Sequence, residues 1–275
     1  MNNEQYFRPS PIHFLNNKNF DFEFLDKYSN ENYNKIILPD SLFNSPKDTI
    51  INYFSILREA ENISQGGCGS IGSAKMPYPI SYNFFTSEYK NKINYSSYFS
   101  LFKDIGHMNL IKLNNVTYDN ISNGTYKYFI ELETIEPSVN GHTSFSYYYG
   151  YVYIHNENEN YKISDIDLRG EDFLCAAYHG WNHNAELYVD TVYGNWCKLI
   201  KKRYPTEQHG YVKNIYVAGN DEHDYRFEFF QLTNGTDIEI QQFVKGINNE
   251  WKPIKIDVNK CIQRCNSYSS LFPLY

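Results

Sequence analysis

Residues 125–135 read TYKYFIELETI and carry the clearest strand pattern of the chain. Apolar and polar side chains alternate along this stretch, and alternate residues of a strand point to opposite faces of a sheet. The expected core face carries Tyr126, Tyr128, Ile130 and Leu132, and the expected solvated face carries Lys127, Glu131 and Glu133. We therefore predict an antiparallel sheet with one buried face and one wet face.

Three more strand candidates flank this stretch, at residues 109–118, 143–155 and 161–168. Turn-forming residues separate them, among them Ser122-Asn123-Gly124. A helix is expected before the strands, because Ser45 can cap it and Pro46 would occupy its first position. Apolar residues follow at helical spacing up to Ala60, so one side of this helix should be buried.

The second half repeats this order in a shorter form. A helix is expected from Asn184 to about Lys202, followed by strands at residues 211–217, 225–232, 237–244 and 251–258. The pattern predicts an α+β fold of two modules, with helices packed on curved antiparallel sheets. The expected divisions are a polar N-terminal arm at residues 1–44, a first module at 45–180 and a second module at 181–275.

The first module resembles the NTF2-like superfamily, through its helix at Ser45–Ile63 and the hairpin formed by residues 150–154 and 161–166. The second module resembles the cystatin-like fold of one helix over a meander. The likeness implies a concave sheet face that helices close. NTF2-like modules include isomerases, dehydratases, ligand-binding scaffolds and assembly domains, so the fold leaves the activity open. The whole chain also resembles uncharacterised proteins of spore-forming Gram-positive bacteria.

Composition excludes some function classes. The chain of 275 residues carries 25 Lys and Arg against 32 Asp and Glu, a net charge of −7, which argues against nucleic acid as a partner. No run approaches the ~20 apolar residues needed to cross a bilayer, so no membrane span is expected. The first residues lack the features of a secretory signal, which predicts a soluble, cytoplasmic protein if Met1 is the natural start.

Five cysteines are present: Cys68, Cys175, Cys197, Cys261 and Cys265. Their odd number and scattered spacing are not typical of a disulfide framework and suit a reducing compartment. For the C-x3-C pair of Cys261 and Cys265, a local disulfide or free surface thiols are expected.

Cys175, His179 and His183 form the densest cluster of possible metal ligands, at spacings of four residues. Gly180 interrupts a continuous helix there, so this spacing does not place the three on one face. A buried connector with hydrogen-bonded histidines is the preferred interpretation, and we predict no metal and no cofactor. A nucleophilic pair of Cys175 with a histidine is a further alternative.

Asp165 and Asp167 are the candidate catalytic residues, because two carboxylates on one strand face could supply a general acid or base. Candidate ligand-binding residues are the alternating tyrosines of the preceding strand: Tyr147, Tyr149, Tyr151 and Tyr153. The alternative, which we favour, is a wet strand face beside tyrosine-rich packing.

No complete catalytic constellation emerges, and tyrosine is abundant. We therefore expect a non-enzymatic binding or assembly protein that recognises a partner through a cavity or a sheet face. The alternative is a small-molecule enzyme of the NTF2-like isomerase or hydrolase type, with Asp165 or Asp167 as the general base. The partner would be another protein or a second copy in a homodimer, joined through an exposed aromatic sheet face.

Overall fold

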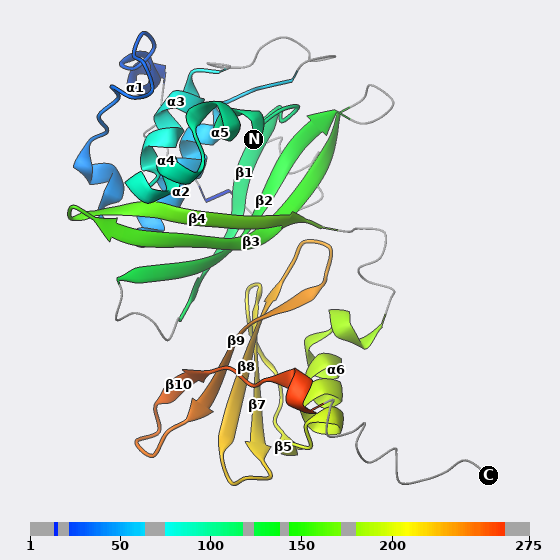
Figure 1. Ribbon diagram of the computed structural model, residues 1–275. Helices are drawn as coiled ribbons and strands as arrows, with labels where there is room; N and C mark the ends of the chain where they lie inside the picture. Colours follow the sequence, from blue (N-terminus) through cyan, green and yellow to red (C-terminus); the bar gives the residue numbers. More distant parts are fainter. Residues whose placement is uncertain are drawn as a thin grey trace. The chain divides into compact units, whose positions relative to one another are not determined.

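A computed structural model describes residues 14–15, 22–63, 75–117, 124–137, 143–171 and 180–261. The chain divides into two compact units, Met1–Glu171 (unit 1) and Asp172–Tyr275 (unit 2), a boundary about nine residues before the predicted one. Each unit has its own antiparallel sheet and helices, which confirms the mixed α+β class (Figure 1). Within the described ranges, no helix is long and apolar enough to cross a membrane.

Unit 1 begins with a series of short helices. They are α1 (Phe22–Asp26), η2 (Asp40–Phe43), α2 (Pro46–Arg58), α3 (Pro77–Ser81), η3 (Tyr82–Phe84), α4 (Ser87–Lys92) and α5 (Tyr95–Ser100). The expected cap of α2 is present, because the backbone N–H of Asp48 donates to the Ser45 hydroxyl at 3.1 Å. Helix α2 is the longest of the series and ends at Arg58, five residues before the predicted end.

Four strands follow: β1 (His107–Val116), β2 (Thr125–Pro137), β3 (Thr143–Glu157) and β4 (Asn160–Gly170). They pair in the order β1-β2-β3-β4, each antiparallel to the next. One face of this sheet carries apolar side chains, such as Leu110, Ile130 and Val152, that join the core of the unit with those of α2. Figure 1 shows the helices gathered against the sheet.

The predicted polar arm is wrong for residues 22–44. Phe22 and Phe24 lie in helix α1. Leu25, Leu38 and Phe43 are buried in the core of unit 1. These isolated apolar residues follow neither strand nor helix periodicity. Their burial is determined by contacts with distant parts of the chain and not by the pattern of the segment in which they lie.

The predicted wet face of β2 is also wrong. Glu131 and Glu133 have none of their surface exposed. The Lys112 ammonium on β1 lies 2.6 Å from the Glu131 carboxylate, and the Tyr147 hydroxyl on β3 donates to Glu133 at 2.8 Å. Both carboxylates can be buried because each has a charged or hydrogen-bonding partner on a neighbouring strand.

Unit 2 packs a bent helix on a second sheet. It contains η5 (Trp181–His183), α6 (Ala185–Val189), the π-helix η6 (Asp190–Trp196), and strands β5 (Ile200–Arg203), β6 (Glu207–His209), β7 (Val212–Gly219), β8 (Asp224–Gln231), β9 (Asp237–Lys245) and β10 (Trp251–Ile254). The strand order is β10-β9-β8-β7-β5, and β6 also pairs with β7. Val189 and Tyr193 of the helix pack against Ile215 and Phe227 of the sheet.

The predicted helix does not reach Lys202. The helical backbone stops near Cys197, and Lys198 adopts a positive φ of 54°. The chain then pairs as β5 with β7, where Ile200 is opposite Gly219. Asn220 holds the turn, because its side-chain amide donates to the Lys198 carbonyl at 2.7 Å.

A disulfide bond joins Cys197, at the end of η6, to Cys261. The cysteine spacing was not expected to give a disulfide framework, and Cys261 was expected in a local disulfide with Cys265 or as a free surface thiol; the bond to Cys197 shows that both expectations are wrong for Cys261. The two bonded cysteines are 64 residues apart, and only the folding of unit 2 brings them together. Cys68, Cys175 and Cys265 lie outside the described residues.

Loss of this bond should destabilise unit 2. Closing a loop of 64 residues restricts the unfolded chain, which corresponds to about 4 kcal/mol in the chain-entropy model. Cys197→Ser, or reduction of the unchanged protein, should lower the urea midpoint of the tryptophan-monitored transition. Cys265→Ser is the matched control and should leave it unchanged. If Cys265→Ser is the variant that lowers the midpoint, the pairing described here is wrong.

Candidate functional site

Unit 1 contains a cavity of about 410 Å³ between helices α2, α4 and α5 and the sheet. Its walls are mainly aromatic and aliphatic; the described lining includes Tyr53, Phe54, Leu57, Phe85, Tyr89, Tyr98, Phe102, Met108, Leu132, Tyr148, Ile166 and Leu168. Leu101 also lines it and has 62% of its surface exposed, which places the mouth of the cavity just after α5.

Local sequence patterns position these walls. Tyr53, Phe54 and Leu57 share the buried side of α2, as their helical spacing predicts. Leu132 on β2 and Tyr148 on β3 are direct cross-strand neighbours and line the cavity together. The sequence therefore predicted one part of the cavity wall, the buried face of α2. It did not indicate that a cavity lies next to this face.

Three hydroxyl groups form a hydrogen-bonded chain at the cavity wall. The Tyr53 and Tyr98 hydroxyls lie 3.2 Å apart, and the Ser81 hydroxyl lies 2.7 Å from that of Tyr98. Ser81 donates to the backbone carbonyl of Tyr78 at 3.0 Å. Both tyrosines are almost completely buried, so this chain supplies the partners that their hydroxyls need.

The tyrosines of the lining stay neutral over the physiological pH range. Burial raises the pKa of the Tyr53 and Tyr98 hydroxyls well above the ordinary value. Burial, followed by the charge of Asp165, raises the pKa of Tyr89 to about 12. Burial and then the Glu136 carboxylate raise that of Tyr148 to about 12. Among the lining residues that the structure describes there is no carboxylate, amine, imidazole or thiol, so none can act as a general base near neutral pH.

Asp165 and Asp167 do not line this cavity. Their neighbours on β4, Ile166 and Leu168, do, and the two aspartates are exposed. Successive residues of a strand point to opposite faces, so the carboxylates project away from the cavity. The predicted catalytic pair is thus separated from the enclosed space that its chemistry would need.

The predicted tyrosines lie on the same outer side of the sheet. Tyr151 is opposite Asp167 and Tyr149 is opposite Arg169, and Tyr147 bonds to Glu133. Lys127 lies over the Tyr151 ring at 3.7 Å from its centroid. The structure therefore groups Tyr147, Tyr149, Tyr151 and Tyr153 with charged residues and away from the cavity, which Tyr148 lines instead.

The structure describes only one of the three predicted metal ligands, so the set stays untested. Cys175 and His179 lie outside the described residues. His183 has its Nδ1 atom 3.3 Å from the Thr236 hydroxyl. The described ranges hold no group of three or more His, Cys, Asp or Glu residues arranged to bind a metal ion.

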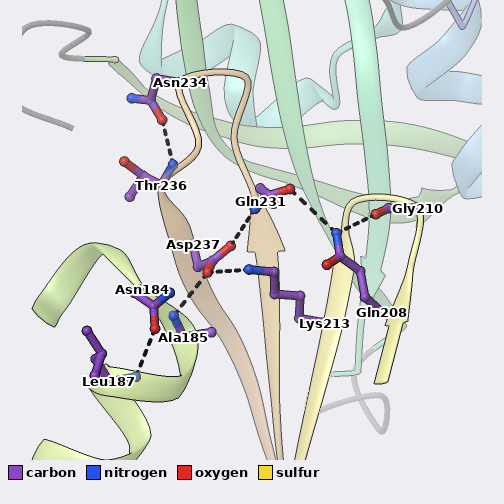
Figure 2. A network of polar contacts seen from close by, with 10 residues as sticks. All are labelled: Asn184, Ala185, Leu187, Gln208, Gly210, Lys213, Gln231, Asn234, Thr236 and Asp237. Atoms are coloured by element: carbon purple, nitrogen blue, oxygen red, sulfur yellow. Dashed lines mark hydrogen bonds and ion pairs between the residues drawn. The ribbon is translucent and has the colours of Figure 1, made fainter. Parts of the chain in front are cut away.

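A polar network in unit 2 centres on Asp237 at the start of β9 (Figure 2). Its carboxylate accepts from the backbone N–H of Ala185 at 3.0 Å and lies 2.7 Å from the Lys213 ammonium. Gln231 donates to the other oxygen at 3.3 Å. The carboxylate thus satisfies a free N–H at the beginning of α6, and the network attaches that helix to the sheet.

A second cluster in unit 2 surrounds Glu239 on the face that packs against η6. The Tyr193 hydroxyl lies 2.9 Å from each carboxylate oxygen, and Gln242 donates to Glu239 at 3.2 Å. Burial raises the pKa of Glu239 to about 7, although the hydrogen bonds from Tyr193 and Gln242 oppose that shift. This carboxyl group therefore titrates near neutral pH.

Unit 2 should lose stability as the pH rises towards 7. The folded-state pKa of Glu239 lies above the ordinary glutamate value of 4.5, so the folded state binds an extra proton between these two pKa values. The free energy of unfolding should fall by up to about 1.4 kcal/mol per pH unit across this window. Urea unfolding followed by tryptophan fluorescence measures it.

Glu239→Gln should flatten this pH profile, and Glu222→Gln, at an exposed glutamate of the same unit, should not. An unfolding free energy of the unchanged protein that rises from pH 5 to pH 7 would contradict the assignment.

Comparison with known proteins does not assign this chain to a family. No family model matches the chain, and neither a curated protein nor a solved structure matches it. The evidence for its function therefore comes from the residues of the chain itself.

Proposed function

We propose that unit 1 is a binding module that holds an uncharged, mainly apolar small molecule in its cavity without transforming it. The carrying observation is a cavity of about 410 Å³ whose described lining is apolar apart from neutral hydroxyls. Binding cavities for small molecules usually measure about 300–1,000 Å³ and have mostly hydrophobic walls with a few polar groups. The cavity meets both criteria.

The lining also defines the charge of the ligand. A charged molecule would lose its hydration on entry, and the described walls offer no opposite charge to replace it. An uncharged molecule loses little hydration and gains from the burial of its apolar surface. The described walls also hold no group that ionises near neutral pH, which favours binding over the isomerase or hydrolase alternative.

The arrangement of helices over one sheet face supports the likeness of unit 1 to NTF2-like proteins, among which are ligand-binding scaffolds. The disulfide of unit 2 supports a location different from the predicted one. We infer that the chain works in an oxidising environment, because such bonds persist there and are rare in the cytosol. Peptide mapping without reductant, on protein taken from its native source, tests this inference.

Two naphthylamine dyes of nearly the same shape test the proposed function. The protein should bind N-phenyl-1-naphthylamine, which is neutral, and enhance its fluorescence. It should bind the sulfonated analogue 1-anilinonaphthalene-8-sulfonate at least about tenfold more weakly, because the cavity offers the sulfonate no counter-charge.

A cavity-filling variant locates the binding site. Leu132→Trp should weaken binding of the neutral dye about tenfold or more, since Leu132 lines the cavity and a larger ring takes its space. Leu187→Trp is the control, at an exposed leucine of unit 2. Equal binding to both leucine variants, or tighter binding of the sulfonate, would exclude the cavity as the site.

A further inference from the structure

The hydroxyl chain of the cavity has a definite direction. Ser81 has a single hydroxyl proton, and the backbone carbonyl of Tyr78, 3.0 Å away, can only accept it. The Ser81 oxygen then accepts from Tyr98 at 2.7 Å, and the Tyr98 oxygen accepts from Tyr53 at 3.2 Å. In this arrangement all three protons have acceptors. The reverse direction would leave the Tyr53 proton without one among the described residues.

The series of hydroxyl groups therefore ends at the Tyr53 oxygen, which can still accept a hydrogen bond. The Tyr53 hydroxyl donates to Tyr98, and no described residue donates to its oxygen. Tyr53 lines the cavity and has 2% of its surface exposed, so bulk water does not take the place of that donor. A buried oxygen with unused lone pairs at a cavity wall favours a ligand that can donate a hydrogen bond.

A second tyrosine hydroxyl belongs to the lining of the same cavity. Tyr89 lines the cavity from α4, and the Phe85 ring lies between its ring and that of Tyr53, at 5.4 Å from the latter. Its own hydroxyl makes no hydrogen bond to a described residue, and its ring is fixed by stacking on Phe85 at 4.2 Å. Tyr89 can therefore donate to a ligand atom inside the cavity that Tyr53 also lines.

We propose that the cavity selects a hydroxyl-bearing apolar molecule, a phenol or an alcohol, whose hydroxyl donates to Tyr53 and accepts from Tyr89. This inference rests on the proposed function and names its ligand class. A hydrocarbon would leave the Tyr53 oxygen without a donor and the Tyr89 hydroxyl without an acceptor. An ether or ester could accept from Tyr89 but could not donate to Tyr53. Selection by such groups is strong because buried polar atoms left unpaired weaken the binding of the wrong ligand.

Two small aromatic compounds separate the possibilities. Both 2-naphthol and 2-methoxynaphthalene have the same ring system and an accepting oxygen, but only the naphthol has a proton to donate. Their affinities are measured at pH 7 by displacement of N-phenyl-1-naphthylamine. The unchanged protein should bind 2-naphthol about tenfold more tightly, the size expected for one buried hydrogen bond.

Tyr53→Phe should reduce this preference to about onefold and leave the affinity for 2-methoxynaphthalene nearly unchanged. Tyr128→Phe is the matched control, because Tyr128 is a buried tyrosine of the same unit that is absent from the described lining. It should keep the preference. Circular dichroism establishes that each variant is folded, and the two compounds compared on the unchanged protein provide a test that needs no variant.

The possible results test the hydroxyl selection and the proposed binding function separately. Equal affinities for the two compounds, or a preference that survives Tyr53→Phe, would overturn the hydroxyl selection while leaving the binding function intact. Failure of the dye and of both compounds to bind would overturn the binding function itself.

Discussion

Hydrogen bonds hold the hydroxyl groups of several buried tyrosines, and the packing of both units depends on these bonds. The chain has 27 tyrosines and 19 phenylalanines, so its core must be built largely from rings. In unit 1 the hydroxyls of Tyr53 and Tyr98 bond to each other, and in unit 2 the Tyr193 hydroxyl bonds to Glu239. Each such bond fixes a ring at both ends, by packing and by its polar tip. These bonds join α2 to α5 in unit 1 and η6 to β9 in unit 2.

The strands were predictable from the sequence because their signals are local. Alternation and turn residues placed β1 to β4 and β7 to β9 within a few residues of their observed bounds. Residues 22–44 and 197–203 were not predictable, because tertiary contacts determine their structure. Leu25 is buried by distant elements, and Cys197 is bonded to a residue 64 positions away. Neither fact leaves a periodic trace in the sequence.

The candidate site was misplaced for a related reason. Alternation shows which residues share a face of a strand, but not which face the helices cover. A register shift between Tyr153 and Ile154 adds to the difficulty: Asp165 pairs with Tyr153 while Ile163 pairs with Ile154, and Ser164 is left between them. Ile163 and Ile166, three residues apart, therefore both face the core, and the aspartate between them is exposed. The buried face of α2 was the reliable signal for the site.

The ring-built core also explains why a cavity persists in unit 1. Aromatic side chains are rigid and have few rotamers, so anchored rings cannot collapse into a gap as flexible aliphatic chains do. Phe85 is stacked on Tyr89, and Tyr98 is held by two hydroxyl bonds, which fixes three of the rings that line the space. Under the proposed binding function, a ligand would enter a site that is already formed, and little of its binding energy would be lost in ordering side chains. The hydrogen bonds that anchor Tyr53 and Tyr98 thus also help to keep the cavity open.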